Sequence, residues 1–338
     1  MTGIHDLARE VGVSTATVSR ALRGLPRVSE STRERVLEAA VRLGYVPSPH
    51  AVGLASGGQT RSVAIVVPFV TRWYFAAVVH GAEQVLREQG YDLLLYNLAG
   101  DSAARHRVLR TQVLTKRVDA VLVVGLGPTA EEIAAMQRQG SPVVTLGARV
   151  EEWSSVRIDD VEASRTAMRH LLDLGHRRIA FVGGLGEDGL DFTTPTARLE
   201  GYHSSLRDAG LPLDPALELD GRFTLDGGVD CGRAVAAMDQ RPTAVFCASD
   251  EMAIGLMSAL REAGLRVPED VSVVGVDDHE MARFFDLTTV RQPVHEQGRI
   301  AAQQILRSLG GADGPAEVVP EHVELATELV VRATTAAV

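Results

Sequence analysis

The chain has 338 residues, 45% of them hydrophobic, and this length exceeds what one ordinary core requires. No apolar run approaches the roughly 20 residues of a membrane span, and the N-terminus lacks the charged-then-apolar pattern of a signal peptide. Two cysteines, Cys231 and Cys247, are too few for a disulfide framework or a metal cluster. We therefore expect two or three domains in a cytoplasmic protein without a metal or cofactor.

The net charge of −10 is unevenly distributed. Residues 1–60 contain seven arginines and five acidic residues, a net +2, so the remaining chain carries −12. An acidic body is repelled by nucleic acid, whereas a mildly basic segment is attracted to phosphate in a salt-dependent manner. If this chain binds DNA, only its N-terminal segment is suited to the contact.

That segment is typical of a helix, a tight turn and a second helix. Residues 4–11 place apolar side chains at i, i+3, i+4 and i+7. Gly12 suits the sharp turn, and Ser14 is a good N-cap for a helix over 15–22. Val18, Ala21 and Leu22 form the buried face of this second helix. Small hydroxyl, methyl and guanidinium groups remain outside, at Thr15, Ala16, Thr17, Ser19 and Arg20.

These outward side chains suit the major groove of DNA. Hydroxyl groups can donate to phosphates or base edges, the Ala16 methyl can contact a thymine methyl, and Arg20 can pair with guanine. A third helix is predicted over 31–43, capped by Ser29 or Ser31 and ended by Gly44. Its apolar stripe is predicted to comprise Val36, Leu37, Ala40 and Leu43. A generic three-helix bundle is the alternative, disfavoured by the short turn and the order of the residues.

From residue 62 the sequence alternates between apolar β-branched runs and helical segments. Helices are expected over 74–89 and 250–262, and strands over 62–68, 92–97, 119–125, 142–147, 178–184, 244–249 and 271–278. This alternation predicts two doubly wound α/β units. Ligands bind at the carboxyl ends of such strands, so the cleft between the two units is the expected site.

Polar side chains gather at those strand ends. Asp159-Asp160, Ser249-Asp250-Glu251 and Asp277-Asp278 each follow a strand, and Arg198 opens another segment. Carboxylates, which accept hydrogen bonds from hydroxyl groups, and an arginine, which donates in a fixed fork, suit a polyhydroxylated ligand. Aromatic faces for a sugar ring are offered by Trp73, Tyr74, Phe75 and Phe223.

Structural roles compete with binding for some of these residues. Asp250 is as good a helix N-cap as a ligand contact, and either Asp159 or Asp160 is expected to cap the helix that follows. His176 is expected to bind its own loop. An enzyme is disfavoured because the chain lacks dinucleotide, phosphate-loop and metal-binding motifs, and residues 183–186 lack the third spaced glycine.

The motifs together resemble the lactose/galactose repressor (LacI/GalR) family across essentially the whole chain. They are carried by Asp6-Leu7-Ala8, residues 13–22, 28–36 and 43–47 in the headpiece, and by residues 174–180, 198–202, 242–246, 250–255, 267–275 and 287–293 in the body. The resemblance implies a helix-turn-helix headpiece (1–46), a hinge (47–61) and an α/β core like that of periplasmic sugar-binding proteins. It implies core subdomains of 62–160 with 291–320, and of 161–290 with 321–338.

The resemblance also implies a mechanism and its residues. A homodimeric repressor would bind a pseudo-palindromic operator, and a small effector, a sugar or sugar derivative, would control its affinity. The implied DNA contacts are Ser14, Thr15, Ala16, Thr17, Ser19, Arg20, Arg23 and Leu54, the last a minor-groove wedge. The implied effector contacts are Phe75, Asp160, Arg198, Phe223, Ser249, Asp277 and Gln292. A stand-alone sugar-binding protein of periplasmic type is the rival, opposed by the headpiece and the missing signal peptide.

The chain departs from the family pattern in the hinge, the cleft and the headpiece. In the hinge, which could otherwise be a plain flexible linker, Val52 stands where Arg is usual and Gly53 lowers helix propensity. In the cleft, Ser249 replaces Asn, and Arg72-Trp73 replaces Asn-Pro. In the headpiece, Gly3 replaces a Thr N-cap and Arg23 replaces Asn. These changes predict an effector unlike the familiar ones and an altered phosphate contact near Arg23.

Overall fold

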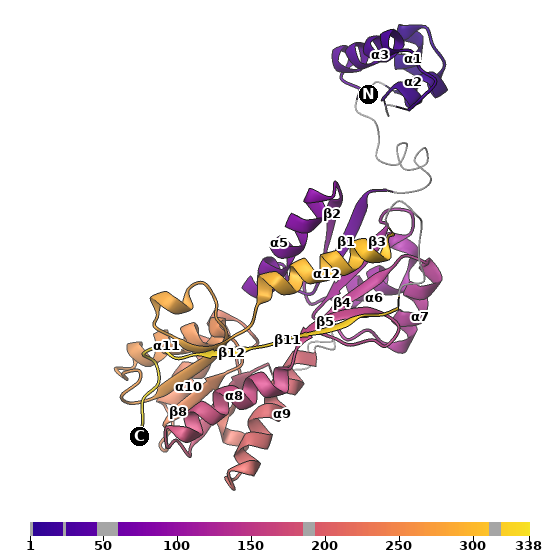
Figure 1. Ribbon diagram of the computed structural model, residues 1–338. Helices are drawn as coiled ribbons and strands as arrows, with labels where there is room; N and C mark the ends of the chain where they lie inside the picture. The colour runs from indigo at the N-terminus through magenta and orange to yellow at the C-terminus, as the bar shows by residue number, and fades with distance from the viewer. Residues whose placement is uncertain (1–2, 23–24, 46–59, 185–192, 311–318) are drawn as a thin grey trace. The chain divides into compact units, whose positions relative to one another are not determined.

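The computed structural model describes residues 3–22, 25–45, 60–184, 193–310 and 319–338. Residues 3–45 contain α1 (Ile4–Val11), α2 (Thr15–Leu22) and α3 (Glu30–Leu43), as Figure 1 shows. Gly12 adopts φ 73° and ends α1, so the chain turns where glycine costs least. Ser14 Oγ accepts from the Thr17 amide at 3.1 Å, and Ser29 caps α3, as the sequence predicts. Asp6 accepts from the Gly3 amide, which supports the start of α1 without a side-chain cap.

The headpiece core differs from prediction at one position. Leu7, Val18 and Val36 are fully buried at the centre of the three helices. Leu37, predicted to belong to the apolar stripe of α3, is 45% exposed, and Ala39 is buried in its place. The buried face of α3 follows positions 36, 39, 40 and 43, so residue 37 is rotated about 100° from the start of that stripe.

The rest of the described chain forms two lobes, each built on a six-stranded sheet. The first sheet has the order β11-β5-β4-β3-β1-β2, and the second has the order β12-β10-β9-β8-β6-β7. Neighbouring strands pair in parallel, except that β12 is antiparallel to β10. The strands are β1 (Ser62–Val67), β2 (Asp92–Asn97), β3 (Ala120–Val124), β4 (Val143–Leu146), β5 (Ser154–Ile158), β6 (Ile179–Gly183), β7 (Glu218–Asp220), β8 (Ala244–Cys247), β9 (Ser272–Asp277), β10 (Thr288–Arg291), β11 (His322–Leu325) and β12 (Glu328–Val330).

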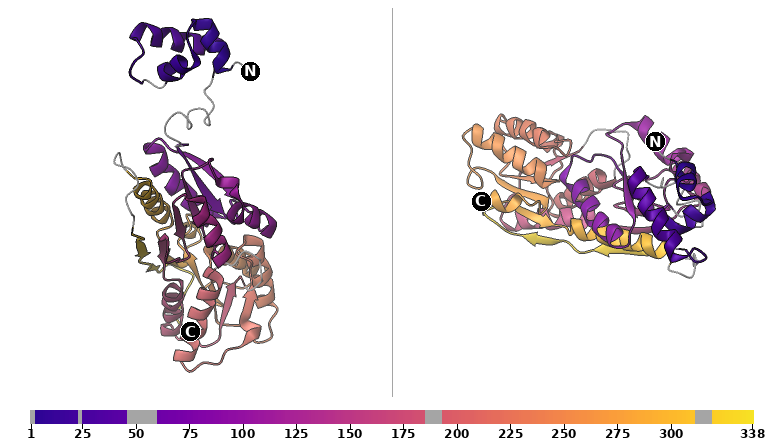
Figure 2. Two further views of the ribbon diagram at one scale, coloured as in Figure 1. Left: turned by 90° about the vertical axis from the view of Figure 1, so that its right-hand side faces the viewer. Right: turned by 90° about the horizontal axis from the view of Figure 1, so that it is seen from above.

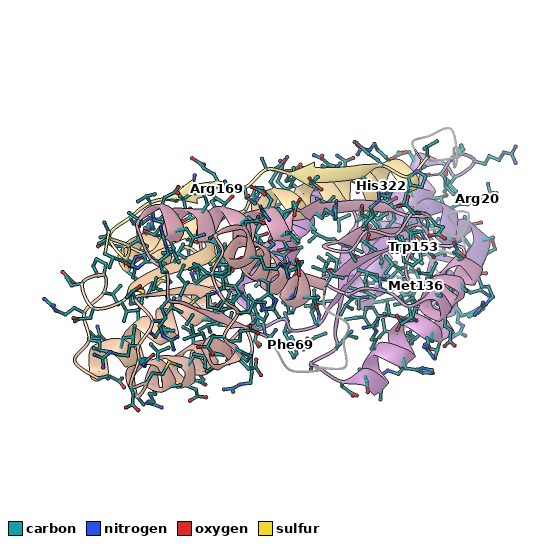
Figure 3. The ribbon with its side chains drawn as sticks, turned by 90° about the horizontal axis from the view of Figure 1, so that it is seen from below. Arg20, Phe69, Met136, Trp153, Arg169 and His322 are labelled. Carbon is teal, nitrogen blue, oxygen red and sulfur yellow. The ribbon has the colours of Figure 1, made fainter. Side chains whose placement is uncertain are left out.

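Helices cover these sheets. In the first lobe they are α5 (Trp73–Glu88), α6 (Ser102–Arg110), α7 (Ala130–Gln139) and α12 (Val294–Ser308), with the short η1 (Gln112–Leu114). In the second lobe they are α8 (Asp160–Asp173), α9 (Thr193–Asp208), α10 (Leu225–Ala236) and α11 (Asp250–Glu262), with η2 (Pro215–Leu217) and η3 (Ala282–Phe284). Helices α5 and α12 pack closely because Gly298 has no Cβ, which would lie 2.1 Å from the Val78 carbonyl oxygen. Trp153 and Met136, labelled in Figure 3, are buried inside the first lobe.

The chain crosses between the lobes after β5, after β10 and after β11. Figure 2 shows the last crossing as the yellow C-terminal strands, which run along one edge of the core from one lobe to the other. The sequence places residues 321–338 in the second lobe, but β11 pairs in parallel with β5 of the first sheet. His322 Nδ1 lies 2.9 Å from the Ser155 hydroxyl, and Arg157 pairs with Glu324 at 2.7 Å. In the last crossing, the boundary between the first and the second lobe therefore follows Leu325.

Candidate functional site

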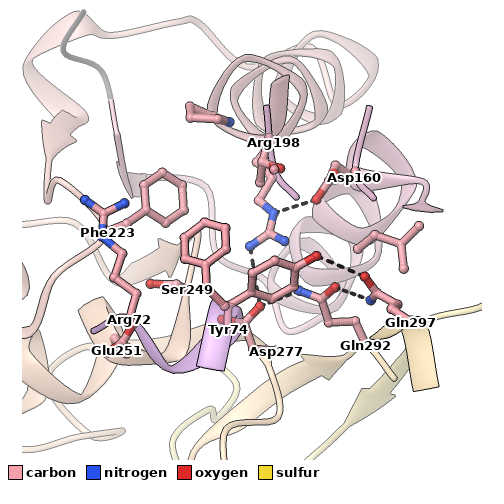
Figure 4. Close-up of a pocket in the computed structure, with 16 residues that line it drawn as sticks. Arg72, Tyr74, Asp160, Arg198, Phe223, Ser249, Glu251, Asp277, Gln292 and Gln297 are labelled. Atoms are coloured by element: carbon pink, nitrogen blue, oxygen red, sulfur yellow. Dashed lines mark hydrogen bonds and ion pairs between the residues drawn. The ribbon is translucent and has the colours of Figure 1, made fainter. Parts of the chain in front are cut away.

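A pocket lies between the lobes, where the carboxyl ends of strands from both sheets meet the first turns of several helices (Figure 4). Its wall from the first lobe comprises Arg72, Tyr74, Phe75, Gly125, Gly147, Ile158, Gln292 and Gln297. Its wall from the second lobe comprises Asp160, Thr194, Pro195, Arg198, Phe223, Ser249, Glu251 and Asp277. This is the position that doubly wound sheets offer to a ligand. A molecule bound here would contact both lobes at once.

The seven residues predicted to contact an effector all line this one pocket. Phe75 and Phe223 supply aromatic surface, Ser249 a hydroxyl, and Gln292 an amide, beside Asp160, Arg198 and Asp277. Their binding role stays a prediction, since no ligand is present. Asp160, Ser249 and Asp277 lie together because parallel strands expose their carboxyl ends on the same side of a sheet, and the full set of seven was implied by the family resemblance.

Arg198 is the buried centre of the pocket, with only 4% of its side chain exposed. Its Nε donates to Asp160 at 2.8 Å, and Nη1 donates to the Ala248 carbonyl and lies 3.7 Å from Asp277. Burial opposes the charge, but the two carboxylates outweigh burial and raise the pKa of Arg198. The guanidinium therefore stays charged and is held in one orientation.

Asp277 ends β9 in an unusual backbone conformation, with φ 127°. Such a conformation is rare for a residue with a side chain and persists only where surrounding contacts enforce it. Gln292 Nε2 donates to Asp277 at 2.6 Å. Burial raises the Asp277 pKa to about 6, although Arg198 and Gln292 both act to lower it.

A hydrogen-bonded chain connects Asp277 to the first lobe. Gln297 Nε2 donates to Gln292 Oε1 at 2.8 Å, and the Tyr74 hydroxyl donates to Gln297 Oε1 at 3.0 Å (Figure 4). Burial, and to a lesser degree the nearby Asp160, raises the pKa of Tyr74, so the phenol remains a donor. The network joins α5 and α12 of the first lobe to the end of β9 in the second lobe.

The strand-end acids divide into binding candidates and structural groups. Ser249, rather than Asp250, caps α11 by accepting from the Met252 amide at 3.3 Å. Asp250 is fully buried away from the pocket lining, where it accepts from the Thr289 hydroxyl at 2.7 Å and the His279 amide at 2.8 Å. It is therefore neither the N-cap nor a ligand contact.

Two further structural assignments are confirmed. Asp159 caps α8 by accepting from the Glu162 amide at 2.9 Å, which leaves Asp160 to face Arg198. His176 lies 2.9 Å from the Thr243 hydroxyl and 3.0 Å from the Ala336 carbonyl, and so joins its loop to the C-terminal segment.

The sequence did not point to Gln297 as a lining residue. It grouped Glu251, the second residue of α11, with the polar strand ends but did not include it among the effector contacts. Gln297 follows Gln292 by five residues, and only the turn at Pro293 into α12 brings the two amides together. The sequence indicated Arg72 as part of a departure from the family pattern in the cleft and Tyr74 as one possible aromatic surface. It gave neither residue a specific role.

Metal chemistry finds no support in the described part of the chain. There, no group of three or more His, Cys, Asp or Glu side chains is arranged to hold a metal ion. Cys231 and Cys247 are both free and buried, and burial raises the pKa of both thiols. Among the same residues, no helix has the length and apolar character needed to cross a bilayer.

The candidate nucleic-acid interface is the outer face of α2. Val18 and Ala21 are buried, whereas Ser14, Ala16 and Arg20 are exposed and Thr15, Thr17 and Ser19 are half-buried. The Ser14 and Thr17 hydroxyls lie 2.9 Å apart, so the start of this helix is pre-ordered. Arg23 and Leu54 lie outside the described residues, as does nearly all of the predicted hinge, so their predicted contacts stay predictions.

A helix-turn-helix unit in one chain with a two-lobed α/β core defines a class of protein, the DNA-binding regulator with a ligand-binding domain. Residues 3–48 match the family model described as bacterial regulatory proteins, lacI family, and residues 168–335 match a periplasmic binding protein-like domain. The chain is 35% identical to the HTH-type transcriptional repressor PurR of Vibrio atlanticus over 98% of this chain and 99% of that protein.

Solved structures agree with this assignment. A transcriptional regulator CelR–cellobiose complex is 33% identical, with a TM-score of 0.71 over 99% of this chain and 100% of the other. The lac repressor dimer bound to operator and the anti-inducer ONPF is 26% identical, with a TM-score of 0.80 over 99% of both chains. The chain therefore belongs to the lacI family of bacterial regulatory proteins. It is a DNA-binding transcriptional repressor with an effector-binding domain, and neither an enzyme nor a stand-alone binding protein.

Proposed function

We propose that the effector of this repressor is a sugar or sugar derivative, bound in the pocket between the lobes. The observation that carries the proposal is the buried cluster of Arg198, Asp160 and Asp277, flanked by the rings of Phe75 and Phe223. Carboxylates and a guanidinium fix hydroxyl groups, while aromatic rings cover the apolar face of a sugar. The cellobiose complex of a similar regulator supports this ligand class.

Effector binding would control DNA affinity through the relative orientation of the lobes. The pocket takes residues from both lobes, and the Tyr74–Gln297–Gln292–Asp277 chain already connects them. A ligand shifts the equilibrium between two orientations of the lobes only if it binds one orientation more tightly than the other. Operator DNA then changes the affinity for the effector by the same factor as the effector changes the affinity for operator. Allosteric control of repression follows from this coupling.

On DNA, we propose that α2 enters the major groove of each half of a pseudo-palindromic operator. Ser14, Thr15, Ala16, Thr17, Ser19 and Arg20 would make the contacts, with Arg23 beside them and Leu54 as a minor-groove wedge. The exposed position of Arg20 and Ala16 supports direct contact with bases. The lac repressor, which is similar over 99% of both chains, binds operator as a dimer in its solved structure.

The dimer contact is proposed to include the segment around η3. Large apolar side chains are exposed here, with Phe284 at 67%, Met281 at 40% and Phe285 at 38%. Contiguous apolar side chains exposed to water are costly and mark interaction surfaces. A second copy of this chain is the proposed occupant, since two headpieces are needed to read a palindrome.

A ligand screen tests the effector proposal. Neutral sugars, sugar acids, sugar phosphates and nucleosides would be added to the full-length protein, with thermal stability as the readout. Each stabilising compound would then be tested for its effect on operator binding by gel shift. A sugar that both stabilises the protein and alters operator affinity supports the proposal. Binding of only non-carbohydrate compounds would overturn it.

A further inference from the structure

The charged side chains lining the pocket have an excess of negative charge. Among the described lining residues, the carboxylates belong to Asp160, Glu251 and Asp277 and the guanidinium groups to Arg72 and Arg198. The formal balance is therefore one negative charge. A phosphorylated or carboxylated ligand normally needs arginine, lysine or amide donors free to pair with it.

Both guanidinium groups already bind protein acceptors. Arg198 is held by Asp160 at 2.8 Å, by the Ala248 carbonyl and by Asp277 at 3.7 Å. Arg72 lies over the Phe69 ring, 3.9 Å from its centroid, and its Nη2 donates to the Arg222 carbonyl at 3.2 Å. Arg222 belongs to the second lobe, so Arg72 reaches across the pocket mouth instead of into its interior.

Helix N-termini are the other common anion sites, and α8, α11 and α5, which border the pocket, each have a carboxylate nearby, whereas the first turn of α9, where Thr194 and Pro195 line the pocket, has none. Asp159 caps α8, and Asp160 occupies its first turn. Ser249 caps α11, and Asp250 and Glu251 occupy its first turn.

The third N-terminus, that of α5, faces a carboxylate from the opposite lobe. Glu251 of α11 lines the pocket together with Arg72, the N-cap of α5 (Figure 4). The Trp73 ring in turn lies 4.6 Å from the His279 ring, which belongs to the second lobe. Glu251 thus supplies the negative charge that a ligand anion would otherwise bring to this end of the pocket.

The charge of Glu251 is affected by burial and by the nearby charges of Asp277 and Arg72. Burial, followed by repulsion from Asp277, raises the pKa of Glu251, while the Trp73 amide and Arg72 oppose that change. A further anion in the pocket would increase the repulsion without gaining a free cation. A hydroxyl group, in contrast, can donate to a carboxylate.

We infer that the pocket is selective for uncharged effectors, and that Glu251 is the residue that rejects phosphorylated ones. This inference rests on the proposed function, because it narrows the sugar class to neutral sugars. It also concerns Arg72-Trp73, where the chain departs from its family, because Arg72 lines the pocket together with Glu251.

The test compares matched neutral and phosphorylated ligands. Each neutral sugar that binds in the screen would be titrated beside its phosphate ester, with ribose and ribose 5-phosphate, and glucose and glucose 6-phosphate, as the first pairs. Of the two tryptophans, Trp73 stands between the lining residues Arg72 and Tyr74, so a Trp153→Phe variant leaves Trp73 as the fluorescent reporter. We expect the neutral member to bind at least tenfold more tightly.

Glu251→Gln then isolates the charge, since the side chain keeps almost the same size and shape. We expect the phosphorylated ligand to gain about tenfold in affinity, while the neutral ligand changes less. Glu262→Gln is the matched control, because Glu262 ends the same helix and is 61% exposed. It should behave as the unmodified protein.

The outcomes separate the inference from the proposed function. A phosphorylated ligand that binds as tightly as its neutral partner overturns the inference and leaves a sugar effector intact. An unchanged preference in Glu251→Gln removes the role of Glu251. If no member of any pair and no other sugar binds, the proposed sugar effector fails, and the inference fails with it.

Discussion

Arg198 on α9 donates a 2.8 Å hydrogen bond to Asp160 at the start of α8, and both side chains are almost completely buried. This pair gives Arg198 a structural role in addition to its predicted contact with an effector. A variant at this position therefore affects folding and ligand response together, and the two effects have to be measured separately.

Arg198→Met should abolish the effector response and reduce the free energy of unfolding by about 3 kcal/mol, because breaking a buried pair leaves Asp160 without its charge partner. Urea unfolding measures the stability, and gel shifts with and without effector measure the response. Arg165→Ala is the control: it breaks a more exposed pair with Asp208 and should cost less than about 1 kcal/mol. An effector response that survives in Arg198→Met would remove Arg198 from the binding site.

Effector affinity should fall at acidic pH because of Asp277. Burial raises its pKa to about 6. Protonation removes an acceptor for ligand hydroxyl groups, so affinity should fall about tenfold between pH 7.5 and pH 5. Calorimetric titrations at a series of pH values measure this change, and Asp277→Asn should flatten the profile. A flat profile in the unmodified protein would contradict the prediction.

The same carboxyl group affects folding with the opposite sign. Its pKa is higher in the folded than in the unfolded chain, so its contribution to stability is complete below the unfolded pKa and is lost as pH rises through about 6.

Arg20→Ala should relax base preference more than it weakens non-specific binding. Arg20 is exposed on α2, and loss of a guanine contact removes about 1–3 kcal/mol of discrimination. Gel shifts over a series of operator variants measure the preference. Arg9→Ala, at a side chain on α1 that is 81% exposed, is the control and should weaken all sequences evenly. Equal losses on every sequence for Arg20→Ala would show that it contacts only phosphate.

Leu54→Ala should reduce DNA bending, because a smaller side chain cannot separate the central base step. A circular-permutation gel assay measures the bend angle. Val52→Ala, a change of similar kind in the same predicted hinge, should leave the bend largely intact. An unchanged bend in Leu54→Ala would remove the wedge.

Phe284→Glu should weaken the proposed dimer at least tenfold, because it places a charge on a surface that self-association would bury. Sedimentation velocity over a range of protein concentrations measures the change. Leu213→Glu replaces an apolar residue of the same lobe that is also exposed and should leave the dimer intact. A dimer that persists in Phe284→Glu places the interface elsewhere.

Local patterns in the sequence are enough to define the elements of this protein. The i, i+3, i+4 spacing, Gly12 and the caps Ser14 and Ser29 specify the headpiece, because helix boundaries depend on neighbouring residues. Apolar β-branched runs specify the central strands. The rule that ligands bind at strand ends pointed to Asp160, Ser249 and Asp277, and the family resemblance implied the full set of seven residues that line the pocket.

Tertiary structure alone decides how distant segments meet. β11 joins the first sheet by pairing with β5, Asp250 turns away from the pocket to Thr289, and Glu251 lines the pocket together with Arg72 of the opposite lobe (Figure 4). Each of these outcomes depends on hydrogen bonds and charges between residues far apart in the chain. The residues next to each other in the chain do not reveal such distant partners. The helix-turn-helix could therefore be predicted from the sequence, whereas the proposed charge selectivity of the pocket could not.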